Sequence, residues 1–167
     1  IANTANSGTN VVVNGLTNGT AYTFRMAAIT SAGLGAWGTF ASATPARIPL
    51  SPLNIVVTGQ DKKATLTWAA PTSNGGSAIT GYAIYRNNVL VTTVSAATLS
   101  YLDTNGVTGL TNGTSYYIKV AAVNSLGAGT MSAVSAAITP SAPCSSACAV
   151  GDVGPAGGIV FLTPATA

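Results

Sequence analysis

The sequence contains no histidine and no glutamate, and it has three aspartates among 167 residues. Histidine is the side chain that most often acts as a general base or a metal ligand in proteins. A catalytic pair of carboxylates is hard to assemble from three aspartates that lie far apart in the chain. These absences argue against an enzyme, and we expect no cofactor and no metal site.

Charged residues of all kinds are scarce. They make up 5% of the chain, against about 25% in an ordinary soluble domain. The net charge of +3 comes from six basic residues, of which only Lys62 and Lys63 are adjacent. Nucleic-acid binding needs several clustered cations, so we expect no nucleic-acid partner. The longest nearly apolar run, residues 157–162, is far shorter than the ~20 residues that span a bilayer, and we expect no membrane span.

Small uncharged residues replace the missing charges. Ala, Thr, Gly, Ser and Asn together account for 99 of the 167 residues, and 47% of the chain is hydrophobic. That hydrophobic content is enough for a folded core, so disorder is not expected. A free monomer normally keeps about a quarter of its surface charged for solubility. The scarcity of charge therefore predicts self-association, or close contact with neighbouring repeats of the same chain.

One segment of the chain repeats itself. The sequence GLTNGT of Gly15–Thr20 recurs 94 residues later as Gly109–Thr114, and the residues that follow each copy match in pattern. A period of this length is too long for a solenoid repeat and fits whole domains in tandem.

Both copies alternate between apolar and polar positions, as half-buried β-strands do. In the second copy one face carries Tyr116, Ile118, Val120 and Ala122. Similar alternation occurs at residues 64–68 and 79–84, and residues 134–138 predict the last strand. No window shows sustained helical periodicity, and turn residues recur about every ten positions. The pattern predicts an all-β chain built of sandwiches.

Residues 47–140 resemble a complete fibronectin type III domain, an immunoglobulin-like β-sandwich. Trp68 lies on the predicted second strand, and Tyr82 ends the sequence ITGY that opens the third. Leu110 and Tyr116 frame the corner before the sixth strand. The resemblance implies that these four residues form the core, with the Tyr116 hydroxyl bonded to backbone upstream as a tyrosine corner.

Residues 1–46 resemble an incomplete domain of the same kind. Leu16 and Tyr22 occupy the positions of Leu110 and Tyr116, so we assign them to the core. The segment carries only the last three strands of the family pattern, E, F and G. About 45 residues without a disulfide are too few to fold alone. We expect either a chain cut from a longer protein or strands that complete a sheet with another molecule.

Residues 141–167 form a third region, a linker with a cysteine pair and the start of a glycine-rich β segment. Cys144 and Cys148 are close enough to form a disulfide, which would indicate an oxidising, extracellular setting. Free thiols remain an alternative, and a metal site would need two further ligands. The glycine-rich residues 151–162 resemble a motif that follows such repeats in large bacterial surface proteins, often actinobacterial ones.

Two further features allow a functional and a structural interpretation. Asn18 and Asn112 each begin an Asn-Gly-Thr sequence, which fits N-glycosylation but also suits the geometry of a tight turn. Trp37 occurs in the first copy alone, where it is either packed against the next domain or exposed as a contact for a sugar or a partner.

These observations predict a non-catalytic structural or adhesive module of a bacterial extracellular or cell-surface repeat protein, part of a fibre, filament or layer. A surface glycan or another cell-surface molecule is the expected external partner. The alternatives are the linker modules of a secreted polysaccharide-degrading enzyme and a phage tail or virion protein.

Overall fold

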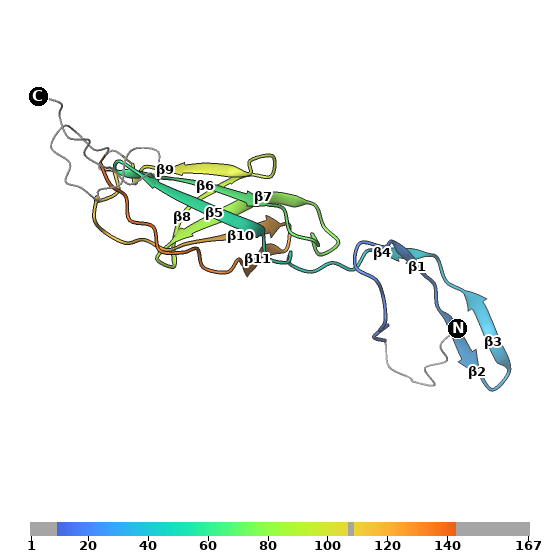
Figure 1. The fold of residues 1–167 in the computed structure, drawn as a ribbon. Coiled ribbons are helices and arrows are strands. Elements are labelled where there is room, and N and C mark those ends of the chain that lie inside the picture. Colours follow the sequence, from blue (N-terminus) through green and yellow to red (C-terminus); the bar gives the residue numbers. More distant parts are fainter. Residues whose placement is uncertain (1–9, 107–108, 143–167) are drawn as a thin grey trace, which may run out of the picture.

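The computed structural model describes residues 10–106 and 109–142 (Figure 1). Eleven strands and no helix occur in these ranges, so they contain no helix that could cross a membrane. The strands are β1 (Tyr22–Phe24), β2 (Ala27–Thr30), β3 (Gly33–Trp37), β4 (Ala41–Ala43), β5 (Leu53–Gln60), β6 (Lys63–Ala69), β7 (Ile79–Arg86), β8 (Val89–Ser95), β9 (Ser100–Asp103), β10 (Ile118–Asn124) and β11 (Gly127–Met131).

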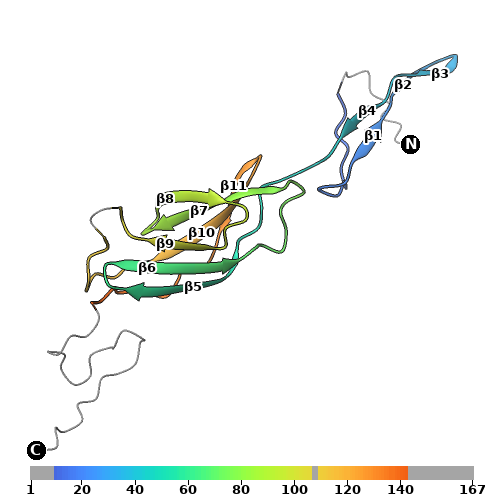
Figure 2. The same ribbon diagram turned by 90° about the horizontal axis from the view of Figure 1, so that it is seen from above.

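Strands β5 to β11 form two antiparallel sheets, with strand orders β5-β6-β9 and β11-β10-β7-β8. The two sheets face each other as the layers of a sandwich (Figures 1 and 2). This architecture confirms the predicted all-β, immunoglobulin-like fold. The buried apolar core between the sheets consists of Ala64, Leu66, Trp68, Tyr82, Ile84, Leu110, Ile118, Val120, Ala122 and Ile138.

The alternation in the sequence explains which side chains enter the core. On β6 the apolar Leu66 and Trp68 are buried, whereas Thr67 between them is exposed. On β10 Ile118 and Val120 are fully buried on the same face, because every second residue of a strand points the same way. Burying each such large side chain contributes about 1.5–3 kcal/mol.

The hairpin between β7 and β8 depends on two asparagines. Asn87 and Asn88 form the two-residue turn, and both have positive φ angles, 49° and 67°. Asparagine tolerates this left-handed conformation better than most residues, and paired positive φ angles match the twist of the strands that they join.

The chain after β11 departs from the last strand predicted over residues 134–138. Instead of regular pairing, Ser132 and Ser135 turn their hydroxyl groups toward β10. The Ser132 Oγ accepts the N–H of Val120 at 3.1 Å, and the Ser135 Oγ accepts that of Ile118 at 3.0 Å. Because side-chain oxygens satisfy these backbone donors, the segment follows β10 without forming a continuous ladder.

Strands β1 to β4 form two small antiparallel pairs before the sandwich. β1 pairs with β4, so that Tyr22 lies opposite Ala43, and β2 pairs with β3. Both pairs repeat the arrangement around β10 and β11, 94 residues later. Figure 1 and Figure 2 show this first part and the sandwich lying end to end, joined by the segment between β4 and β5.

Candidate functional site

The metal-ligating residues do not gather into a centre. Within residues 10–106 and 109–142, no group of three such side chains lies close enough to hold a metal ion. Asp61 accepts a hydrogen bond from the Nδ2 of Asn112 at 2.7 Å. The proposed disulfide residues Cys144 and Cys148 lie outside the described residues, as does the glycine-rich segment that follows them.

Three of the predicted core residues lie deep in the sandwich. Trp68, Tyr82 and Leu110 are all buried, and the ring centroids of Trp68 and Tyr82 are 5.5 Å apart. Burial raises the pKa of the Tyr82 hydroxyl, because the phenolate would lose its hydration. The indole N–H of Trp68 is buried without a hydrogen-bond partner in the described part of the chain.

The other predicted core residues form a tyrosine corner in each part. The hydroxyl oxygen of half-buried Tyr116 accepts the backbone N–H of Thr111 at 3.1 Å. In the first part, Tyr22 accepts the N–H of Thr17 at 3.0 Å, beside half-buried Leu16. This backbone hydrogen bond lowers the pKa of Tyr22, because it stabilises the phenolate.

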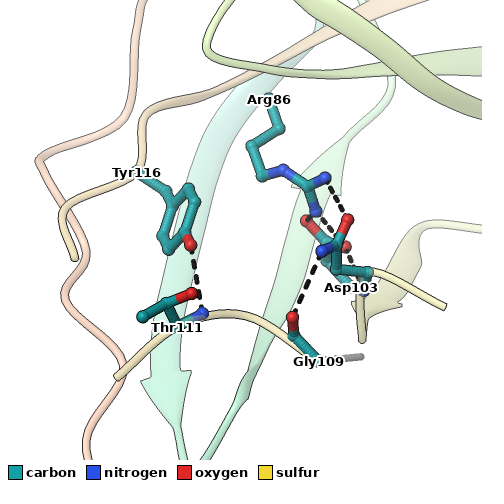
Figure 3. Close-up of polar contacts among 6 residues, drawn as sticks. Arg86, Asp103, Gly109, Thr111 and Tyr116 are labelled. Carbon is teal, nitrogen blue, oxygen red and sulfur yellow. Dashed lines mark hydrogen bonds and ion pairs between the residues drawn. The ribbon is translucent and has the colours of Figure 1, made fainter. Parts of the chain in front are cut away.

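An ion pair connects the two sheets beside the corner of Tyr116 (Figure 3). Nη1 of Arg86, at the end of β7, lies 2.8 Å from both carboxylate oxygens of Asp103, at the end of β9. Nη2 of Arg86 donates to the Oδ1 of Asn105 at 2.6 Å, and the Nδ2 of Asn105 donates to the carbonyl of Gly109 at 3.2 Å. These contacts link β7 of one sheet to β9 of the other and so stabilise the sandwich.

The arrangement best suited to a non-catalytic function is the joint between the two parts. The connecting residues 46–50 lie between two elements of the sandwich, the loop 73–76 and the β10–β11 hairpin. We call this loop and hairpin together the linker seat. Backbone hydrogen bonds attach the connection to both sides of the seat. On the loop side, the N–H of Arg47 donates to the carbonyl of Gly75 (2.8 Å), and the N–H of Leu50 donates to the carbonyl of Ser73 (3.0 Å). On the hairpin side, the N–H of Thr130 donates to the carbonyl of Pro49 (3.3 Å).

Asn124, the last residue of β10, closes the seat. Its buried side chain donates from Nδ2 to the carbonyls of Arg47 at 2.8 Å and Asn74 at 3.0 Å. Its Oδ1 accepts the N–H of Leu126 at 2.9 Å. The first part has Thr30 at the equivalent position, and the Thr30 hydroxyl bonds within its own turn. The amide that holds the connection is therefore a feature of the second part.

Two consecutive glycines bring the backbone of the seat close to the connection and to the first part. Gly75 and Gly76 have φ angles of 76° and 87°. A Cβ on Gly75 would overlap the carbonyl of Arg47, and a Cβ on Gly76 would overlap the backbone nitrogen of Gly19 in the first part. Any other residue at these positions would meet both backbone strain and a steric clash.

Sequence reasoning missed the contacts that hold the connection. The partners of the seat are far apart in the chain, since Arg47 and Asn124 are separated by 77 residues. The available signal was an asparagine that ends a buried strand, in a chain whose first copy has threonine there. The asparagine of the suggested glycosylation sequence at Asn112 also has a structural role, because its Oδ1 accepts the N–H of Lys62 at 2.9 Å.

Comparison with known proteins places these features in a family. The family model described as the fibronectin type III domain matches residues 50–138. The chain is 35% identical over 145 residues to chitinase A1 of Niallia circulans, covering 81% of this chain and 19% of that protein. It is 38% identical over 145 residues to endoglucanase B of Cellulomonas fimi, covering 77% of this chain and 13% of that protein. The chain thus spans less than a fifth of the length of these relatives.

A solved structure shows the same fold. Domains A168–A170 of titin superpose with a TM-score of 0.56 at 24% identity, covering 75% of this chain and 43% of that one. At this identity the likeness is evidence for the fold alone.

Proposed function

Because the chain belongs to the fibronectin type III family, we propose that it is a spacer in a secreted bacterial polysaccharide-degrading enzyme. The fibronectin type III domain is a non-catalytic module. Supporting the enzyme context, relatives named chitinase and endoglucanase contain the similar region as a small share of their length. Both are bacterial, and an extracellular location is part of the proposal.

The observation that carries the spacer proposal is the linker seat. Backbone groups of the connection are bonded on both sides, and Asn124 bridges the connection to the loop. Domain linkers without such bonds allow successive modules to move independently. A connection held in this way keeps the direction from one module to the next, so that tandem modules hold distant domains at a set separation.

Small-angle X-ray scattering of the 167-residue chain tests the joint. We expect Gly75→Ala to open the seat, because its methyl group would overlap the Arg47 carbonyl, and to broaden the distribution of overall dimensions. Gly113→Ala is the matched control, since Gly113 has a similar φ of 79° but no atom within 4 Å of the added Cβ. Asn124→Ala removes the bridging amide by a second route. Variants that stay folded and scatter like the wild-type chain would contradict a fixed joint.

The enzyme context needs a separate experiment on the complete protein. We expect its reading frame to encode a polysaccharide-degrading domain, and Gly75→Ala to slow turnover of an insoluble polysaccharide more than that of a soluble oligosaccharide. A distance set by a spacer matters when one domain is held on a surface while another reacts there. A reading frame without any such domain would overturn the enzyme context and leave the joint as a property of the module.

A structural module of a surface fibre is the second candidate. The observation that favours it is the 5% charge, together with exposed apolar residues such as Val12, Met26 and Val89. Surfaces of this composition associate readily with copies of themselves. Light scattering and electron microscopy of the complete native protein distinguish the two candidates. Ordered fibres or arrays would favour the surface module, and a dispersed monomer at high concentration would contradict it.

A further inference from the structure

Two aromatic rings and one arginine form an exposed cluster on the first part, which we call the aromatic patch. It consists of Trp37 at the end of β3, Phe40 just before β4, and Arg25 between β1 and β2. The Cζ of Arg25 lies 4.4 Å from the ring centroid of Trp37 and 5.3 Å from that of Phe40. The residues Trp37 and Phe40 are 41% and 67% exposed. Large exposed rings gathered in this way mark a contact site.

The patch lies on the outer face of the first part. Phe24 at the end of β1, opposite Ala41, is half-buried, whereas the next residue, Arg25, is exposed. The residues equivalent to Trp37 and Phe40 in the second part are Met131 and Val134. In the sandwich these two are 40% and 52% exposed. The patch therefore faces solvent irrespective of what packs against the core side of β1 to β4.

The equivalent surface of the second part is a shallow groove. It has a volume of about 360 Å³ and is lined by Asn87, Asn88, Ser115, Tyr117, Lys119 and Val134. Lys119 corresponds to Arg25, and its Nζ donates to the Oδ1 of Asn88 at 3.0 Å. The two parts thus present a cation at the same position of the same face. In the first part that cation is stacked on two rings, and in the second it is bonded to an amide.

The chemistry of the patch fits a neutral, hydroxyl-rich ligand. Arg25 has no ion-pair partner in the described part of the chain, and residues 1–60 contain no aspartate or glutamate. Its guanidinium N–H groups remain available to hydroxyl oxygens, and stacking fixes its plane beside the rings. The C–H face of a sugar ring is apolar and flat enough to stack on tryptophan or phenylalanine. A single cation is too little charge to select an anionic polymer.

We propose that the aromatic patch is a contact site for a neutral polysaccharide chain. Trp37 and Phe40 stack on sugar rings, and Arg25 orients both rings and donates to sugar hydroxyls. The proposal rests on the proposed function, from which it takes the polysaccharide as the polymer that lies beside the module. The new element is that the spacer itself binds this polymer directly.

Exchange of equivalent residues tests the patch with little risk to the fold. Trp37→Met combined with Phe40→Val gives the first part the side chains that the second part carries at these positions. We expect this double variant to bind at least about fivefold less to particles of insoluble chitin or cellulose than the wild-type chain does, a loss typical of removing aromatic contacts. The reciprocal variant, Met131→Trp with Val134→Phe and Lys119→Arg, should bind more than the wild-type chain. Tyr117→Ala, which removes an exposed ring outside the patch, is the control and should bind as the wild type does.

Salt and self-association provide the other readouts. Binding to a neutral polymer should survive about 1 M salt, at which electrostatic attraction is screened within about 3 Å. Binding that disappears in salt would overturn the neutral ligand. Unchanged polysaccharide binding by the double variant would overturn the patch. Loss of self-association in sedimentation, with polysaccharide binding intact, would instead identify a protein interface.

The patch proposal and the spacer proposal can each fail while the other holds. Gly75→Ala, which opens the linker seat, leaves the patch intact and should bind polysaccharide as the wild-type chain does. The Trp37 and Phe40 double variant should scatter X-rays like the wild type. A wild-type chain that binds neither polysaccharide would end the patch proposal, while the scattering data would still decide the joint.

Discussion

Removing Arg86 should destabilise the sandwich more than removing Asp103, although the two side chains form one ion pair. The Asp103 side chain is 0% exposed, whereas that of Arg86 is 19% exposed. In Arg86→Ala the carboxylate stays buried, with the N–H of Asn105 at 3.1 Å as its remaining hydrogen bond from the described residues. In Asp103→Ala the guanidinium keeps Asn105 and reaches solvent.

The magnitude follows from these surroundings. Leaving one member of a buried ion pair without its partner costs about 3–5 kcal/mol. We expect Arg86→Ala to fall in this range and Asp103→Ala to cost about 1–3 kcal/mol, the cost of a polar group that loses one partner. A domain of roughly 90 residues has about 5–13 kcal/mol of stability in total. The loss of Arg86 would therefore remove about a quarter or more of it.

Urea unfolding followed by circular dichroism measures both variants. Lys119→Ala is the control, since Lys119 is a cation of the same sheet whose contact with Asn88 is exposed. Such a surface change should stay within about 0.5 kcal/mol. Arg86→Lys should lie between wild type and Arg86→Ala, because an ammonium group lacks the planar fork of guanidinium. Equal losses from the two alanine variants, or a larger loss from Asp103→Ala, would refute the reasoning.

Two further predictions concern tyrosines. Tyr116→Phe should lower the free energy of unfolding by about 1 kcal/mol, because the N–H of Thr111 loses its acceptor. Tyr117→Phe is the control in the same urea experiment, and equal effects of the two variants would contradict a specific tyrosine corner. Burial raises the pKa of Tyr82 in the folded chain. The contribution of neutral Tyr82 to the free energy of unfolding is therefore fully present below about pH 10 and should be lost as the pH rises through the raised pKa. Urea midpoints at about pH 8 and about pH 11 measure this loss, which Tyr82→Phe should reduce; an unchanged loss in that variant would assign the effect to other groups.

Much of the sandwich was predictable because it rests on local patterns. Alternation on β6 and β10 indicated which residues enter the core, and the repeated sequence before Tyr22 and Tyr116 indicated two corners of one kind. Both features involve residues that are close in sequence, so the chain displays them directly. The structure adds the hydrogen bonds from Thr17 and Thr111, at 3.0 and 3.1 Å.

The features that sequence reasoning missed depend on which strands meet in space. In the sequence Arg86 and Asp103 are isolated charges. Their contact forms only because β7 and β9 lie in opposite sheets of the sandwich. The irregular chain after β11 depends on Ser132 and Ser135, whose hydroxyls replace backbone acceptors. An alternating pattern cannot distinguish such a segment from a regular strand.

Three of the few cations in this chain each make a local contact. Arg86 holds the two sheets together, Arg25 lies on two rings, and Lys119 is bonded to an amide. These charges serve local structure and do not form a field that would attract a charged partner from a distance. Contacts of this surface must then come from rings, hydroxyls and shape, which act over short range. The proposed neutral polymer, held close by the proposed spacer, would meet those conditions, and this connects the proposal for the linker seat to that for the aromatic patch.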